Sequence, residues 1–288
     1  MKLVSYEGPT GTRLGALEQV GGQEVIADLN QLDTRIPSTM IEFLKGGQEL
    51  RILAERVTKE TTAGRVYRNT VVLKAPVPNP GKIICIGLNY REHAAEANQQ
   101  IPDYPTLFAK YSNGLIGTGE AIVIPPITTQ VDYEGELAVV MGRRARNVAE
   151  SHALSYVAGY APFNDVSARD YQHRTTQWTA GKIFDTFGPM GPALVTADEI
   201  PDPQNLDLRV TIGDELLQNS NTRYMIFSIR HLIAYLSEFM TLEPGDIIAT
   251  GTPAGVGSRR TPQRFLRQGD VVRVEIERLG TLESPVTE

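Results

Sequence analysis

Apolar residues along most of the chain occur in short runs or alternate with polar ones, a pattern that is typical of β-strands. Such runs lie at residues 3–6, 13–18, 23–28, 82–86, 121–124, 134–141, 158–163, 207–212, 246–250 and 271–276. The clearest helical patterns lie at 39–45, 49–59, 89–96 and 225–242. Because strands outnumber helices and do not alternate regularly with them, the pattern predicts a β-rich α+β fold.

A proline-rich segment at residues 75–81 marks the main change in this pattern. It holds three prolines in seven residues, and proline removes a backbone donor and keeps the residue before it extended. We therefore predict a linker here, between a small N-terminal α+β domain at residues 1–75 and a larger β-rich domain at residues 76–288. The N-terminal part has no evident catalytic cluster, and we expect it to support the larger domain.

The composition narrows the classes of partner. The 288 residues include 28 Lys and Arg against 34 Asp and Glu, a formal net charge of −6, which disfavours nucleic acid and anionic membranes. The one cysteine, Cys85, excludes an internal disulfide and a cysteine-rich zinc site. No apolar run reaches the roughly 18 residues of a transmembrane helix, and the first residues lack a signal-peptide core. We therefore expect a soluble, cytoplasmic protein.

Two glutamates, Glu134 and Glu136, lie two residues apart in a predicted strand and therefore share one face. Adjacent like charges that face a β-core need a counter-charge, and a divalent cation that prefers oxygen ligands supplies it. Asp165 follows another apolar strand and is a candidate third ligand. Three carboxylates would leave about three positions open on a six-coordinate Mg²⁺. The alternatives are a solvated strand face for the glutamates and a helix N-cap for Asp165.

His93 and Glu96 lie three residues apart in the predicted helix at 89–96, so they share a face and can hydrogen-bond. A carboxylate beside an imidazole fixes its tautomer and raises its basicity, as a water-activating base requires. An exposed charge pair is the alternative. The next segment, 98–105, has two prolines and few apolar residues, which indicates a mobile loop able to cover a site.

Other signals are weaker. Residues 251–257 are glycine-rich, but their spacing and their place near the C-terminus do not fit a dinucleotide-binding loop. We expect this loop to bring backbone amides close to a substrate. Trp178 and Tyr171 either line a pocket or pack in the core, and His173 and His231 have no evident partner.

Five motifs in order give the chain a family resemblance. They are I-G-L-N-Y-x-x-H-x-x-E (86–96), D-Y-E-G-E-L-A-V-V-M-G (132–142), G-Y-x-x-x-N-D-x-S-A-R-D-x-Q (159–172), G-K-I-F-D-T-F-G-P-x-G-P (181–192) and G-D-I-I-A-T-G-T-P-A-G-V-G (245–257). Together they resemble the fumarylacetoacetate hydrolase family, in its short acylpyruvase-like branch. The resemblance implies a rolled mixed β-sheet, a homodimer, and a Mg²⁺ or Mn²⁺ ion held by Glu134, Glu136 and Asp165.

The resemblance also implies roles for single residues. The catalytic residues would be His93, Glu96 and Lys182, and the substrate-binding residues Gln172, Thr252, Arg169 and Tyr171. In these roles Lys182 adds positive charge where negative charge develops, and His93 deprotonates water.

The activity implied is metal-dependent hydrolysis of a carbon–carbon bond in an acylpyruvate-like 2,4-dioxo acid. An alternative at the same site is decarboxylation of a 2-oxo diacid such as oxaloacetate, for which enolate stabilisation matters and water does not. A non-catalytic, metal-stabilised binding protein is a further alternative. The His93–Glu96 pair and Lys182 disfavour it, because a structural ion needs neither.

Overall fold

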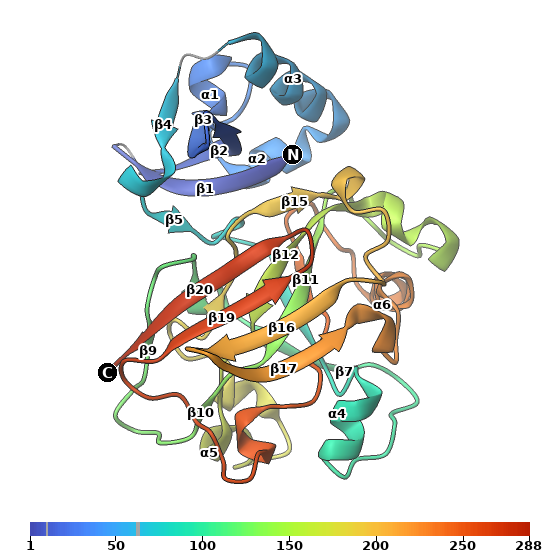
Figure 1. Ribbon diagram of the computed structural model, residues 1–288. Helices are drawn as coiled ribbons and strands as arrows, with labels where there is room; N and C mark the ends of the chain where they lie inside the picture. The colour runs from blue at the N-terminus through green and yellow to red at the C-terminus, as the bar shows by residue number, and fades with distance from the viewer. Residues whose placement is uncertain (10, 62–63) are drawn as a thin grey trace.

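The computed structural model describes residues 1–9, 11–61 and 64–288, which form a strand-rich α+β fold (Figure 1). The predicted fold class is therefore confirmed. The larger sheet contains β1 (Lys2–Gly8), β2 (Gly11–Val20), β3 (Gln23–Asp28), β4 (Arg65–Tyr67), β5 (Leu73–Lys74), β6 (Ile83–Gly87), β7 (Thr106–Lys110), β11 (Gly135–Met141), β12 (Val157–Asn164), β15 (Leu194–Thr196) and β18 (Ile247–Ala249). Within the described residues its order is β4-β3-β2-β1-β15-β12-β11-β18-β6-β7, with β5 beside β1.

A second sheet packs in front of β11 and β12 in Figure 1. It contains β9 (Ile122–Val123), β16 (Asp207–Ile212), β17 (Glu215–Asn221), β19 (Val271–Ile276) and β20 (Gly280–Thr287), in the order β17-β16-β19-β20-β9. Two short ladders pair β8 (Leu115–Ile116) with β14 (Gly188–Pro189) and β10 (Val131–Asp132) with β13 (Ser167–Ala168). The helices are α1 (Leu29–Leu32), α2 (Met40–Lys45), α3 (Gly47–Glu60), α4 (Arg91–Glu96), α5 (Arg169–Gln172) and α6 (Ile229–Phe239).

The N-terminal strands extend the larger sheet. β1 pairs antiparallel with β15, with Leu3 opposite Leu194. Phe43 of α2 belongs to a core cluster that also contains Ala138 of β11. The proline-rich segment is packed rather than free, since Val77 is fully buried. Hydrogen bonds and core contacts thus cross the expected boundary, and the division into domains 1–75 and 76–288 stays a prediction.

The register of the two central strands positions the candidate chemistry. β11 is buried at every residue, and it pairs with β12 so that Gly135 lies opposite Asn164. Glu134 precedes β11 and Asp165 follows β12, so the pairing brings these two residues side by side. The backbone N–H of Asp165 donates to the carbonyl of Glu134 at 2.8 Å.

Helix α6 is shorter than the predicted 225–242. Its N-terminus is fixed by Ser228, whose hydroxyl accepts a hydrogen bond from the backbone N–H of His231, a typical N-cap. Its buried face, which includes Leu232 and Leu236, joins the main core. None of the helices in the described part of the chain is long and apolar enough to span a membrane.

Candidate active site

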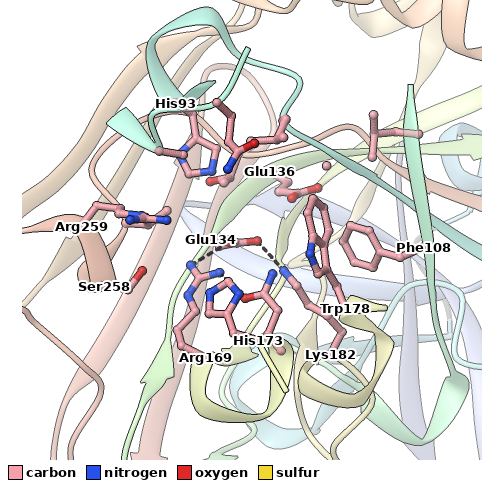
Figure 2. A pocket seen from close by; sticks show the side chains of 18 residues that line it. His93, Phe108, Glu134, Glu136, Arg169, His173, Trp178, Lys182, Ser258 and Arg259 are labelled. Carbon is pink, nitrogen blue, oxygen red and sulfur yellow. Dashed lines mark hydrogen bonds and ion pairs between the residues drawn. The ribbon is translucent and has the colours of Figure 1, made fainter. Parts of the chain in front are cut away.

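A pocket of about 200 Å³ is lined in part by residues of α4 and α5 (Figure 2). Both helices lie at the end of the molecule that is remote from β1–β4 (Figure 1). The lining residues of the pocket are Ile86, Gly87, Leu88, His93, Ala97, Gln99, Phe108, Glu134, Glu136, Arg169, Gln172, His173, Trp178, Lys182, Thr252, Val256, Ser258 and Arg259. They come from segments far apart in the sequence. None of the described residues before position 76 is among them, so the N-terminal part contributes no side chain to the pocket.

Three buried carboxylates meet at this pocket. One oxygen from each of Glu134, Glu136 and Asp165 lies within 4.8 Å of the other two. The sequence predicted that these residues come together, and the pairing of β11 with β12 explains why they do. Carboxylate oxygens at this spacing, with no nitrogen or sulfur donor, form the kind of ligand set that hard divalent cations prefer.

Three buried cations neutralise part of this negative charge. The Nζ atom of Lys182 lies 2.6 Å from Glu134 Oε2, and Arg169 Nη2 lies 2.7 Å from Glu134 Oε1 (Figure 2). The same Nζ atom lies 2.6 Å from Asp165 Oδ2. Lys110 Nζ lies 2.7 Å from Asp165 Oδ1. Burial alone would lower the pKa of Lys182, but Asp165 and Glu134 raise it, so this lysine stays charged.

Glu134 and Glu136 differ sharply in electrostatic environment. Burial would raise the pKa of Glu134, but Lys182 and Arg169 outweigh it and lower the pKa to about 2. Burial and the negative charges of Asp165 and Glu134 raise the pKa of Glu136 well above its usual range. Glu136 accepts a hydrogen bond from the backbone N–H of Gly251 at 2.9 Å, but it has no ion pair with any described residue. A divalent cation would supply the counter-charge that Glu136 lacks, so the residues fit a metal site.

His93 and Glu96 form the predicted pair on α4. His93 Nδ1 and Glu96 Oε2 are 3.0 Å apart, and the backbone N–H of Gly255 donates to Glu96 Oε1 at 2.9 Å. Because Nδ1 is engaged by the carboxylate, the other ring nitrogen, Nε2, is left as the acceptor. His93 lines the pocket, and in Figure 2 its ring and Glu136 both lie above Glu134.

Backbone amides of the glycine-rich loop at 251–257 bind two carboxylates of the site, and their expected approach to a substrate stays a prediction. Gly251 has a φ of +101°, and a Cβ there would lie 2.7 Å from Asn89 Cβ, so only glycine fits. Its N–H binds Glu136, as described above. Thr252 lines the pocket, and its hydroxyl donates to the carbonyl of Gly135 at 3.0 Å and accepts from Gln218 Nε2 at 2.8 Å. The Thr252 proton is therefore committed to the backbone.

Asp132 ties this loop to α5, a role that the sequence did not reveal. Its carboxylate accepts from the backbone N–H groups of Gly257 and Ser258, at 2.8 and 2.9 Å, and from Arg169 Nε at 2.8 Å. The side chain is fully buried. Asp132 thus fixes both the loop backbone and the guanidinium that holds Glu134.

Asp132→Ala should destabilise the protein by about 3–5 kcal/mol, because it leaves the buried Arg169 without one of its two counter-ions. Urea unfolding monitored by fluorescence would measure the loss. Glu42→Ala is the matched control, since Glu42 pairs with Lys45 on the surface at more than half exposure, and it should cost at most about 1 kcal/mol. Equal small losses in the two variants would contradict the assigned role of Asp132.

Of the four predicted substrate-binding residues, Gln172, Arg169 and Thr252 line the pocket, whereas Tyr171 does not. Gln172 lines the pocket, and its Oε1 accepts from Arg169 Nη1 at 2.8 Å. Arg169 also lines the pocket, but its guanidinium is committed to protein groups, so its main role is to position Glu134 and Gln172. Tyr171 is not a pocket residue in the described structure. Its ring packs edge-on against Phe184 at 5.2 Å and under the guanidinium of Arg174 at 3.4 Å, so of the two alternatives given for Tyr171 these contacts favour packing.

Other expectations are also resolved. Trp178 lines the pocket and packs edge-on against Phe108, with the ring centres 5.8 Å apart. His173 lines the pocket mouth, and His231 pairs with Glu150 at 2.7 Å outside it, so both histidines have defined surroundings. In the segment 98–105, Gln99 lines the pocket, and the predicted mobility of this loop stays a prediction.

Comparison with known proteins agrees with this geometry. The family model described as fumarylacetoacetate (FAA) hydrolase C-terminal matches residues 82–287. The rat protein named oxaloacetate tautomerase Fahd2a, mitochondrial, is 43% identical over 289 residues, which cover 99% of this chain and 91% of that protein.

Two solved structures cover the whole chain. The 5-carboxymethyl-2-hydroxymuconate delta-isomerase from Mycobacterium smegmatis has a TM-score of 0.80 and 32% identity, and covers 100% of both chains. The maleylpyruvate hydrolase from Sphingobium sp. SYK-6, solved with manganese(II) and pyruvate, has a TM-score of 0.81 and 34% identity. It covers 100% of this chain and 99% of that chain.

The name of the rat relative also bears on the cellular compartment. That protein is described as mitochondrial, which contradicts the cytoplasmic location expected from the sequence. The expectation rested on composition, on the absence of a membrane-spanning run and on first residues without the apolar core of a secretory signal peptide. Composition and membrane-spanning runs do not report a compartment, and a secretory signal is only one of several kinds of targeting segment.

Proposed function

The chain belongs to the fumarylacetoacetate hydrolase family, and from this premise we propose that it is a divalent-metal-dependent enzyme of small 2-oxo acids. We propose keto–enol tautomerisation of oxaloacetate as its reaction. The observation that carries the proposal is the pocket itself, where a buried carboxylate triad lies beside a charged lysine and a carboxylate-oriented histidine. The 43% identity to a protein named oxaloacetate tautomerase supports the choice of reaction.

We propose that Glu134, Glu136 and Asp165 hold the metal, with Mg²⁺ or Mn²⁺ as the ion. A divalent cation bound there would polarise the keto oxygen of a 2-oxo acid as a Lewis acid. The Mn²⁺ and pyruvate in the Sphingobium enzyme structure support an ion and a 2-oxo acid of this kind. Lys182 adds a fixed positive charge beside the same carboxylates, where negative charge develops as the enolate forms.

His93 is the proposed base for tautomerisation. Its Nε2 takes a proton from C3 of oxaloacetate as the C2–C3 double bond forms, and the resulting imidazolium returns a proton to the keto oxygen, directly or through water. The reaction consumes no co-reactant, because one proton leaves carbon and one arrives at oxygen. Glu96 positions the imidazole, and the N–H of Gly255 holds Glu96 in turn. A positioned base of this kind is typically worth about 10²–10⁴-fold in rate.

Hydrolysis of an acylpyruvate-like acid is the second candidate. The same His93–Glu96 pair favours it, because a base that accepts a proton from carbon also accepts one from water. The similarity to a protein named maleylpyruvate hydrolase supports it. Decarboxylation of oxaloacetate is a third outcome at the same site, for which no base is needed.

One experiment separates the three reactions. Oxaloacetate is followed by proton NMR in D₂O with the metal-loaded protein. Tautomerisation predicts that deuterium replaces hydrogen at C3 faster than in the protein-free control, with pyruvate formed only at the background rate. Rapid pyruvate formation would point to decarboxylation instead. Cleavage of acetylpyruvate to acetate and pyruvate, without C3 exchange in oxaloacetate, would favour hydrolysis.

A homodimer remains part of the proposal. The outer face of α6 supports it, because it carries an aromatic stack in which Tyr235 packs on His231 and on Phe239, and Phe239 is half exposed. Light scattering should return about twice the monomer mass of 31.7 kDa. A mass equal to the monomer at micromolar concentration would exclude the dimer.

A further inference from the structure

The pocket mouth holds hydrogen-bond donors that the proposed chemistry does not use. They belong to Ser258, Arg259 and His173, and all three residues line the pocket. Figure 2 shows Ser258 and Arg259 on the side of the pocket opposite Trp178 and Phe108. The guanidinium of Arg259 and the hydroxyl of Ser258 make no hydrogen bond or ion pair with any residue that the structure describes.

The backbone that carries these donors is nevertheless fixed. The N–H of Ser258 donates to the buried carboxylate of Asp132 at 2.9 Å, and Arg259 follows directly. The next residue, Arg260, differs: its guanidinium is 3.2 Å from Glu215 Oε1 and 3.3 Å from the carbonyl of Leu217. Of two adjacent arginines, one is therefore committed to the protein and the other is free at the pocket mouth.

The electrostatic environment of the mouth is positive. Burial and the guanidinium groups of Arg169 and Arg259 lower the pKa of His173, so its ring is mostly neutral at pH 7. A neutral imidazole still offers one N–H donor. The pocket floor holds Glu134 and Glu136, of which Glu136 has no ion pair with any described residue, whereas the mouth holds the unpaired guanidinium of Arg259.

We propose that Arg259, with Ser258 and His173 beside it, forms an anion subsite that binds the second carboxylate of a dicarboxylic 2-oxo acid. This inference rests on the proposed function and deepens it, because it makes Arg259 a specificity-determining residue. Arginine suits this task, since its planar guanidinium can bind both oxygens of a carboxylate. A monocarboxylic 2-oxo acid would leave the subsite without a ligand and would bind more weakly.

Malate and lactate provide a test that needs no turnover. Both carry a 2-hydroxy carboxylate, and malate adds a second carboxylate. Binding of each to the Mg²⁺-loaded protein is measured by calorimetry, with both enantiomers. The wild type should bind one malate enantiomer at least about 10-fold more tightly than lactate. Arg259→Gln should weaken malate binding by about 10- to 100-fold, as expected for a lost charge-assisted hydrogen bond, and leave lactate binding within about 2-fold.

Two further variants serve as controls. Arg260→Gln changes the adjacent arginine, which lies outside the pocket lining, and it should keep the wild-type preference for malate. Arg259→Lys should retain part of the preference, because lysine keeps the charge but loses the planar fork. Unfolding midpoints of the two Arg259 variants should match the wild type, since the Arg259 side chain has no partner among the described residues to lose.

The subsite is overturned if the wild type does not prefer malate, or if Arg259→Gln keeps the preference. It is also overturned if that variant weakens malate and lactate equally. Failure of the proposed function would look different. In that case the Arg259-dependent preference for malate would remain, while C3 exchange in oxaloacetate would stay at the background rate.

Discussion

Removing the metal should abolish turnover of oxaloacetate, and Glu136→Gln should reduce both metal affinity and turnover by more than ~100-fold. Positioning partners around a metal ligand are typically worth 10–100-fold in affinity, and a direct carboxylate ligand should be worth at least as much. Glu136 is the most informative residue of the triad to replace, because it has no ion pair among the described residues and its replacement breaks none. Calorimetric titration with Mn²⁺ and the NMR exchange assay would measure the two effects.

The unfolding temperature distinguishes a loss of metal binding in Glu136→Gln from a loss of folding. Burial and the charges of Asp165 and Glu134 raise the pKa of Glu136, so its ionised form is unfavourable in the metal-free protein. The metal-free Glu136→Gln variant should therefore unfold at a temperature equal to or above that of the metal-free wild type. Glu283→Gln, on an exposed pair with Arg273, should leave metal affinity and turnover unchanged. Full activity of exhaustively chelated protein would rule out a metal-dependent reaction.

The strands that the sequence predicted are those with a continuous buried face. The ranges at 207–212 and 271–276 coincide with β16 and β19, because apolar residues alternate cleanly along both. The pattern missed β17 and β20. β17 ends in Gln218-Asn-Ser-Asn221, and the buried Gln218 works by hydrogen bonding rather than by apolar packing. Such strands form because they pair with strands distant in the sequence, and the local pattern of apolar residues does not reveal that pairing.

The candidate site shows a similar division. The residues proposed to carry the chemistry occur in short motifs. From these motifs the sequence predicted that the three carboxylates come together and that His93 contacts Glu96, and the structure has both arrangements. Residues that support this chemistry lie outside recognisable spacing. Lys110 comes from β7, an edge of the larger sheet, and reaches Asp165 through pairing between distant strands. Its charge is needed only because the triad is buried, and burial is a property of the fold.

The motifs also do not indicate which of their side chains face the pocket. Tyr171 precedes Gln172 in the same helical turn, yet only Gln172 faces the pocket, because neighbouring residues on a helix point to different sides. Arg259 is the opposite case. It lies two residues beyond the last recognisable motif, and the contacts of the preceding residues with Asp132 place it at the pocket mouth.

His93→Ala should lower C3 exchange in oxaloacetate by at least ~100-fold, the low end for a lost general base. Its Nδ1 is engaged by Glu96, so Nε2 is the proposed proton acceptor. Any cleavage of acetylpyruvate should fall by a similar factor, because water activation needs the same base. Decarboxylation of oxaloacetate should survive better, since it needs an electron sink but no proton acceptor. Parallel NMR assays of the three reactions would compare these losses in one variant.

The comparison requires that the variant still binds Mn²⁺ with wild-type affinity, which calorimetry would establish first. His152→Ala is the matched control, because His152 is exposed and contacts only Ser151 through its ring in the described structure, and it should leave all three rates unchanged. Glu96→Gln should fall between the two, since the imidazole stays but loses the charge that orients it and raises its basicity. Equal losses of exchange and decarboxylation in metal-loaded His93→Ala would show that His93 acts on a step common to both, such as substrate binding, and not as the base.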